Sequence, residues 1–322
     1  MKMAQPTIIS AGIDTSKDQL DIAIHGQAGG VMVENNAAGW QQLAAWLRQS
    51  GVERAGIEAT GGYERGVLRY LQSAGFNVVL LQPLQVKAFA WMRLRRAKSD
   101  RLDAALIADF THTMDAANKM PPDARFDRLG ELLTYIEQIE EDIARFKTRL
   151  EKLHDVRVRQ NIQDEIRRFK KQRLAEIRRL RAEIFAHDDL KTRYNLVLSI
   201  PAIGIRTALS LIVRMPELGL VSREEAAALA GVAPFVHQSG KYQGQTHIGG
   251  GRKRLRRSLY MAAFTGAFNW NPELQALYKQ LLARGKDHKC ATIACARKLL
   301  IYANTVVARG TPWEKTRPLT AA

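Results

Sequence analysis

The first third of the chain alternates short apolar runs with polar or glycine-containing turns. Three runs have the length and β-branched content of strands, and the short turns between them predict an antiparallel meander: TIISAGID from Thr7, LDIAIH and VMVEN. The pattern then predicts, in this order, a helix around Trp40–Gln49, a strand AGIEA, a helix around Glu64–Ala74, a strand NVVLLQ and a helix from Leu84. The predicted order of elements is therefore βββαβαβα.

The middle of the chain has a helical period. Apolar residues recur there at alternating spacings of three and four, which predicts the seam of a coiled coil. These residues are Leu129, Leu132, Ile136, Ile139, Ile143, Phe146, Leu150 and Leu153. The polar stretch HDVRVRQN interrupts the seam, and a second helical run follows from Ile162 to Ile184, so we expect an antiparallel helical hairpin. Its many basic residues, as in RRFKKQR, fit a solvated face or a contact with nucleic acid.

The pattern after Lys191 predicts helices almost throughout. The stretch LSIPAIGIRTALSLI is similar to a helix-hairpin-helix element, whose glycine turn offers backbone N–H groups to a phosphate, but Ala202 stands at the usual first glycine. An ordinary packing unit of two helices fits it equally well. Ser222 and Glu225 form a capping box, and a glycine-rich loop then leads into the basic helix RKRLRR. We expect three domains, at residues 1–125, 126–190 and 191–322.

The charge of the chain indicates a polyanionic partner. Lys and Arg number 49 against 32 Asp and Glu, so the net charge is +17 and the isoelectric point is about 10.1, which favours nucleic acid. We identify no apolar run that approaches the roughly 20 residues of a membrane-spanning helix, and we expect a cytoplasmic protein without a membrane partner. Two cysteines are too few for a disulfide framework. The sequence contains no phosphate loop of the GxxxxGK[ST] form, which argues against an ATP-driven transposition helper.

Two acidic residues stand at helical spacing behind a run of arginines. Asp100 and Asp103 would share one side of a helix, where such a pair is usually surface charge. The order βββαβαβα, however, is that of the ribonuclease H fold, whose sheet would bring Asp14 and Glu58 to the same place. Four crowded carboxylates repel one another unless divalent cations neutralise them, and Mg²⁺ suits such oxygen ligands. Two such ions about 4 Å apart can stabilise the attacking and leaving oxygens of a phosphoryl transfer.

Basic side chains adjoin the acids and recur near the end of the glycine-rich loop. The first group would draw the DNA backbone toward an otherwise anionic pocket: Arg93, Arg95, Arg96, Lys98 and Arg101. The second group would neutralise phosphate charge, although a solvated face beside the apolar positions Leu255 and Leu259 is an equally simple interpretation. Its members are Arg252, Lys253, Arg254, Arg256 and Arg257.

Motifs along nearly the whole chain together resemble the IS110 family of transposases of bacterial insertion sequences, which are related to the Piv and MooV DNA invertases. They are GIDTSKDQLD, IEATGGYE, KSDRLDA, the long helical hairpin, IPAIGIRTA, LAGVAPFVHQSG and LRRSLYMAAF. The resemblance implies a RuvC-like, ribonuclease H-like domain whose DEDD tetrad is Asp14, Glu58, Asp100 and Asp103, with Mg²⁺ as cofactor. It also implies a helical transposase domain in which the nucleophile is Ser239.

The same resemblance implies an assembly and a guide. Dimers would form through the coiled coil and meet as a tetramer, with the tetrad of one subunit working with the serine of another. A structured bridge RNA would select donor and target DNA, and Ser239 would form a phosphoserine intermediate. Two other interpretations stay open at this stage: a structure-selective RuvC-like nuclease that uses water, and a non-catalytic scaffold that binds nucleic acid. His237 precedes Ser239 by two residues, and nothing in the sequence places the two side chains in contact.

Overall fold

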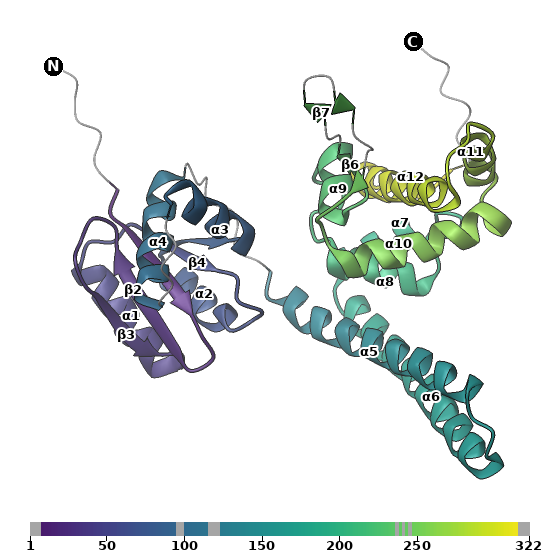
Figure 1. Ribbon diagram of the computed structural model, residues 1–322, viewed down its shortest axis with the longest axis horizontal. Coiled ribbons are helices and arrows are strands. Elements are labelled where there is room, and N and C mark those ends of the chain that lie inside the picture. Colours follow the sequence, from purple (N-terminus) through teal and green to yellow (C-terminus); the bar gives the residue numbers. More distant parts are fainter. Residues whose placement is uncertain are drawn as a thin grey trace. The chain divides into compact units, whose positions relative to one another are not determined.

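The structure is a computed structural model, and it describes residues 8–94, 100–114, 123–235, 238–239, 242–243 and 247–314. Side chains at positions 100–102, 238–239 and 242–243 lie outside that description. The chain divides into two compact units, Met1–Pro122 and Asp123–Ala322 (Figure 1). The division into three domains stays a prediction, since the helical hairpin and the later helices share the second unit.

The first unit is built on a five-stranded mixed sheet. Its strands are β1 (Ser10–Thr15), β2 (Gln19–Ile24), β3 (Gly30–Glu34), β4 (Arg54–Glu58) and β5 (Asn77–Leu81). They lie in the order β3-β2-β1-β4-β5, in which β2 is antiparallel to β1 and β3 while β4 runs parallel to β1 and β5. This is a ribonuclease H-like sheet, and it confirms the predicted succession of elements.

Helices cover both faces of this sheet. They are α1 (Ala37–Gln49), α2 (Glu64–Ser73), α3 (Pro83–Met92) and α4 (Asp100–Thr113). Helices α1 and α2 bury Leu47 and Leu71 against Ile13 of β1 in the larger core of the unit. Alternate residues of a strand point to opposite faces, so Gly12 and Asp14 face the other side, where α4 packs.

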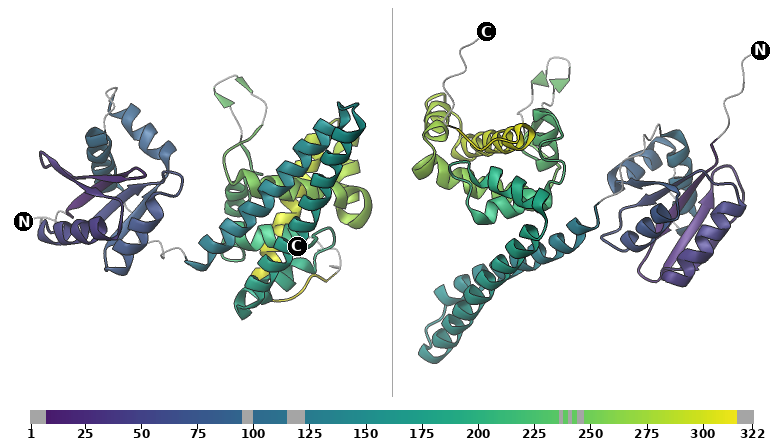
Figure 2. Two further views of the ribbon diagram at one scale, coloured as in Figure 1. Left: turned by 90° about the horizontal axis from the view of Figure 1, so that it is seen from below. Right: turned by 180° about the vertical axis from the view of Figure 1, so that it is seen from behind.

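The second unit begins with two long helices, α5 (Arg125–Glu151) and α6 (Val156–Phe185) (Figure 2). They are antiparallel, because Arg128 pairs with Glu183 near one end and the rings of Phe146 and Phe169 lie 5.5 Å apart further along. The predicted hairpin is present, but its winding into a coiled coil stays a prediction. The polar stretch HDVRVRQN mostly forms the start of α6 rather than a break, because the Asp155 side chain accepts a hydrogen bond from Val158 N at 2.8 Å and caps the helix.

The remaining helices form one core around α12. They are α7 (Asp188–Leu198), α8 (Ile205–Arg214), α9 (Arg223–Ala230), α10 (Lys253–Thr265), a π-helical turn (Gly266–Trp270), α11 (Pro272–Ala283) and α12 (His288–Arg309). Helix α12 has the length and composition of a membrane span, which we did not expect from the sequence, and half of its apolar stretch is buried in the unit. Leu299, Leu300 and Ala303 lie in the core, so α12 serves as its central helix.

Candidate active site

Asp14, the next-to-last residue of β1, and Glu58, the last residue of β4, lie at the same level of two adjacent parallel strands. The register of β1 and β4 pairs Ser10 with Arg54 and continues to Ile13 with Ile57, so the next residues along each strand are Asp14 and Glu58. Residues that pair across parallel strands point to the same face of the sheet. Both side chains are half-buried, and Asp14 Oδ1 accepts a hydrogen bond from Thr15 N at 2.9 Å.

Two glycines let α4 lie directly on that face. A Cβ atom at Gly12 would overlap the backbone nitrogen of Ala108 and the carbonyl oxygen of Ala104, and one at Gly56 would overlap the hydroxyl of Thr111. Gly12 stands two residues before Asp14, and Gly56 stands two residues before Glu58. Each glycine therefore points to the same face as the acid that follows it, and α4 packs on the face that carries both carboxylates.

The direction of α4 brings its first turn to the acidic edge. At its other end, Arg54 Nη1 donates a 2.7 Å hydrogen bond to the carbonyl oxygen of Met114, at the start of β4. The helix thus runs against β1 and β4, and the half-buried Asp103 lies near the carboxyl ends of the strands that present Asp14 and Glu58. The term "acidic edge" below refers to these three residues.

Asp100 begins α4 one turn before Asp103, but its side chain lies outside the described part of the chain. Among the side chains that the structure does describe, no group of three or more Asp, Glu, His or Cys residues is arranged to hold a metal ion. The backbone therefore gathers the acidic edge and the start of α4, while the metal role of the tetrad stays a prediction.

A buried carboxylate that the sequence did not indicate shapes the loop after Glu58. Glu64 is 6% exposed, and its Oε2 accepts hydrogen bonds from Thr60 N at 3.1 Å and Gly62 N at 2.8 Å. Gly61 and Gly62 have φ values of 77° and 119°, which glycine adopts at little cost. The only signal in the sequence was the motif GGYE itself, which gives no partner for its glutamate.

Asn35 joins the two loops that follow the acidic strands. Its Nδ2 donates to the carbonyl oxygens of Ser16 at 2.8 Å and Tyr63 at 3.1 Å, and its Oδ1 accepts from Trp40 Nε1 at 2.9 Å. The loop after β1 and the loop after β4 are therefore held together beside the acidic edge.

The first predicted basic group is described at one position only. The Arg93 guanidinium lies over the ring of Phe89, 5.3 Å from its centroid. Arg95, Arg96 and Lys98 lie outside the described residues, as does the side chain of Arg101. A role in binding DNA stays a prediction for this group.

Ser239 lies in a short ladder that projects from the helices of the second unit. Strand β7 (Gln238–Ser239) pairs with β8 (Tyr242–Gln243), and nearer the helices β6 (Pro234–Phe235) pairs with β9 (His247–Ile248) (Figure 1). The backbone of Ser239 pairs with that of Tyr242, while its side chain and the whole of His237 lie outside the described residues. We call residues 232–250 the serine loop.

An arginine spans the base of the serine loop. Arg256 Nη1 donates to the carbonyl oxygens of Gly231 at 3.1 Å and Gly250 at 2.9 Å, which lie at the two ends of the loop. Gly231 and Gly251 have φ values of 70° and 63°, and a Cβ atom at Gly231 would lie 2.5 Å from the carbonyl oxygen of Gly250. Arg256 therefore closes the base of this loop, and its predicted role in binding phosphate stays a prediction.

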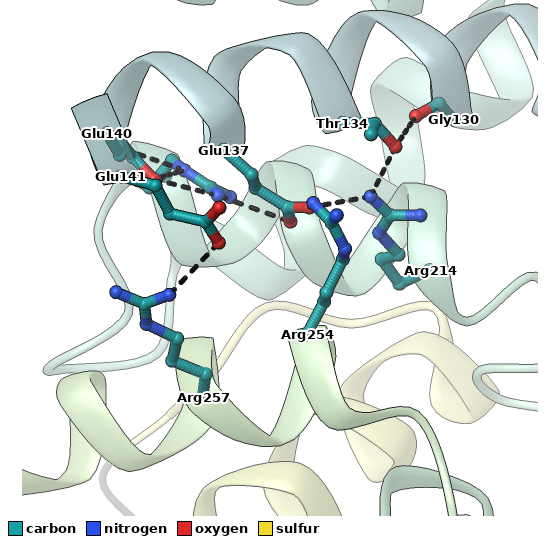
Figure 3. A network of polar contacts seen from close by, with 9 residues as sticks. Gly130, Thr134, Glu137, Glu140, Glu141, Arg214, Arg254 and Arg257 are labelled. Atoms are coloured by element: carbon teal, nitrogen blue, oxygen red, sulfur yellow. Dashed lines mark hydrogen bonds and ion pairs between the residues drawn. The ribbon is translucent and has the colours of Figure 1, made fainter.

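Three other arginines of the second basic group form ion pairs within the chain. Arg252 makes two hydrogen bonds to Glu217, at 2.6 and 2.8 Å. Arg254 lies 2.6 Å from Glu137 and Arg257 lies 3.3 Å from Glu141, so α10 is tied to α5 (Figure 3). Lys253 is exposed. The nucleic-acid role of the group stays a prediction, and any phosphate would compete with these carboxylates.

Glu137 is the centre of a cluster of charges that the sequence did not reveal. Its side chain is 8% exposed and receives Arg206 at 3.3 Å, Arg214 at 2.7 Å and Arg254 at 2.6 Å (Figure 3). Glu140 also pairs with Arg206 at 3.1 Å. Because these arginines come from α8 and α10, the cluster fixes both helices on α5.

Comparison with known proteins identifies the family. A transposase model of the DEDD type named for IS110 matches residues 11–158, and the model described as the transposase IS116/IS110/IS902 family matches residues 194–279. The chain belongs to the IS110 family of transposases. The first match contains all four predicted acids, and the second contains Ser239, so both predicted groups fall within family domains.

Curated relatives of this transposase include two gene-inverting proteins. The pilin gene-inverting proteins of Moraxella bovis and Moraxella lacunata are each 29% identical over 313 residues, which cover 94% of this chain and 97% of theirs. An uncharacterized IS110 protein of Streptomyces coelicolor is 29% identical over 143 residues, 44% of this chain and 35% of its own. Among solved structures, Thermus thermophilus RuvC in complex with a Holliday junction substrate is 17% identical, with a TM-score of 0.29, over 35% of this chain and 99% of that one.

Proposed function

We propose that this recombinase cuts, exchanges and rejoins strands of donor and target DNA at the tetrad Asp14, Glu58, Asp100 and Asp103. The observation that carries the proposal is the register of β1 and β4, together with the glycines that admit α4 on the same face. Half-buried carboxylates at one sheet edge are the hard oxygen ligands that Mg²⁺ prefers. Mg²⁺ bound there would neutralise the carboxylates and polarise the phosphate under attack.

In this proposal the nucleophile is the hydroxyl of Ser239. Its oxygen bonds to a DNA phosphorus, its proton leaves, and the bond from phosphorus to a deoxyribose oxygen breaks, so that this oxygen departs with a proton. The phosphoserine ester keeps the energy of the broken bond, and the hydroxyl of the incoming strand reverses the step without ATP. The proposal is supported by the place of the Ser239 backbone in a short ladder that projects from the helices of the second unit.

The assembly proposal follows from the division of the chain. The acidic edge and Ser239 belong to separate compact units, so a tetrad can work with the serine of a different subunit in a tetramer built from dimers. We propose that the α5–α6 hairpin forms the coiled coil of the dimer. A structured bridge RNA would select the DNA, which fits the net charge of +17, and the complex would act at the nucleoid in the bacterial cytoplasm.

A trapped intermediate tests the nucleophile. The protein is incubated with its RNA, Mg²⁺ and donor DNA, denatured and digested, and the peptide that contains Ser239 is examined by mass spectrometry. We expect a nucleotide on Ser239 in the native protein and none in Asp14→Ala. Free ends without any adduct, or full recombination by Ser239→Ala, would replace this proposal with a RuvC-like nuclease that uses water.

A further inference from the structure

Helix α3 leaves a large part of its apolar surface uncovered. Val86 and Phe89 are buried against Leu106 and Ile107 of α4 in a small separate core. The other side of the helix and its end expose side chains that are normally buried: Leu84 is 78% exposed, Trp91 69%, Met92 69% and Leu94 85%. Such a concentration in one short segment is typical of an interaction surface rather than of scattered exposed residues.

The exposed residues form a stripe that also carries positive charge. Leu84, Lys87 and Trp91 stand at positions i, i+3 and i+7 of the helix and therefore lie along one side. The Lys87 ammonium lies 5.5 Å from the centroid of the Trp91 ring, and Arg93 follows at the helix end. The sequence from Pro83 to Leu94 contains no acidic residue. We call Leu84, Lys87, Trp91, Met92 and Leu94 the α3 stripe.

The backbone of Leu94 gives a second reason to expect a partner. Its φ is 54°, in the left-handed region that glycine favours after the end of a helix. A leucine there costs about 1 kcal/mol. Burial does not offset that cost, since the residue is 85% exposed. Backbone strain of this kind clusters at active sites and ligand-binding segments.

Charge decides which partner fits. A second α3 stripe would bring cations against cations, and the whole chain carries a net charge of +17, so self-association through this surface is unfavourable. Nucleic acid offers the complement, because bases stack on aromatic rings while phosphates pair with Lys and Arg. An exposed tryptophan beside a lysine, with no acid in the segment, suits an unpaired base next to its phosphate.

The position of the α3 stripe indicates that its partner is the DNA strand bound at the acidic edge. Helix α3 packs on α4, and Leu94 is six residues from Asp100, so the chain between them spans no more than about 21 Å. We propose that the α3 stripe holds a DNA strand as it reaches the acidic edge, with Trp91 stacked on an unpaired base and Lys87 on a neighbouring phosphate. This inference rests on the proposed function, which requires separated strands at that edge.

Binding without cleavage tests the inference. A fluorescein-labelled single-stranded oligonucleotide and its duplex are titrated by anisotropy in EDTA with the full-length protein and with Trp91→Ala, Trp91→Phe and Leu220→Ala. We expect Trp91→Ala to weaken single-strand binding about tenfold, Trp91→Phe to retain most of it, and the duplex to respond less. Lys87→Ala should reduce the slope of log affinity against log salt by about 0.7.

Leu220 provides the matched control, because it is 83% exposed in the second unit. Equal losses in Trp91→Ala and Leu220→Ala would overturn the inference, as would unchanged single-strand binding. Weaker binding of a structured RNA alone, or a smaller oligomer for Trp91→Ala in light scattering, would also overturn it. The binding experiment contains EDTA and therefore does not depend on cleavage. A missing Ser239 adduct in the separate trapping experiment would refute the proposed nucleophile, but it would not change the effect of Trp91→Ala on binding.

Discussion

The acidic edge and the serine loop are held in place by different kinds of interaction. At the acidic edge, α4 lies on the backbone of β1 and β4 because Gly12 and Gly56 have no side chains. At the serine loop, one side chain, Arg256, joins two carbonyl oxygens across the base. The first arrangement depends on volume, because an added Cβ would overlap the backbone of α4, while the second depends on two hydrogen bonds at the base of the loop. The two regions should therefore respond to mutation in different ways.

Adding a methyl group at the rigid edge should have the largest effect. Gly12→Ala would place a Cβ inside the α4 backbone, so we expect the free energy of unfolding of the first unit to fall by more than about 3 kcal/mol. Denaturant titration measures this. Gly130→Ala in α5 is the control, because nothing lies within 4 Å of its added Cβ, and it should gain up to about 1 kcal/mol. Native stability in Gly12→Ala would show that α4 does not pack as described.

Removing one buried charge in the second unit should have the next largest effect. Glu137→Gln leaves three arginines around a neutral amide, and we expect a loss of about 3 kcal/mol in the free energy of unfolding. Glu141→Gln removes the exposed partner of Arg257 and should cost less than about 1 kcal/mol. Equal costs in the two variants would mean that the Glu137 cluster does not organise the unit.

Opening the serine loop should have a local effect. Arg256→Met removes two hydrogen bonds to the ends of the loop, so we expect amide exchange at Phe235 and Ile248 to accelerate about tenfold. Amides of β1 and β4 should exchange at unchanged rates. Hydrogen–deuterium exchange with mass spectrometry compares both regions, with Lys279→Met on α11 as the charge-matched control. Acceleration throughout the second unit would assign Arg256 a general structural role instead.

The smallest of the four effects should come from acid, which weakens the ion pair between Arg252 and Glu217. Burial alone would raise the pKa of Glu217, but hydrogen bonds from Arg252 and from the backbone outweigh it and hold the pKa below 4.5. The stabilisation is therefore complete above pH 4.5 and is lost as the pH falls through the lowered folded-state pKa. We expect the difference in Tm between the native protein and Glu217→Gln to shrink from pH 6 to pH 3. A constant difference would contradict the assignment.

The sequence predicted what depends on local pattern. Apolar periodicity gave the order of strands and helices and the long hairpin, and the motifs around Asp14 and Glu58 pointed to one sheet edge. It could not predict contacts between side chains far apart in the chain, such as Arg254 with Glu137, which are 117 residues apart. For the same reason it gave no sign that Arg256 bonds to the carbonyl oxygens of Gly231 and Gly250. The length of α12 was missed because scattered polar residues such as Asn304 conceal a buried helix.

The most direct test of the account is complementation between two inactive proteins. Asp14→Ala retains Ser239 and Ser239→Ala retains the acidic edge, so a tetramer that contains both has a complete site if the two groups act together across subunits. Strand exchange is measured on a donor and a target plasmid with the RNA and Mg²⁺ present. We predict no product with either variant alone and recovery of part of the activity when they are mixed before assembly. Full activity of Ser239→Ala alone, or no recovery in mixed tetramers that form and bind DNA normally, would contradict a site shared between subunits.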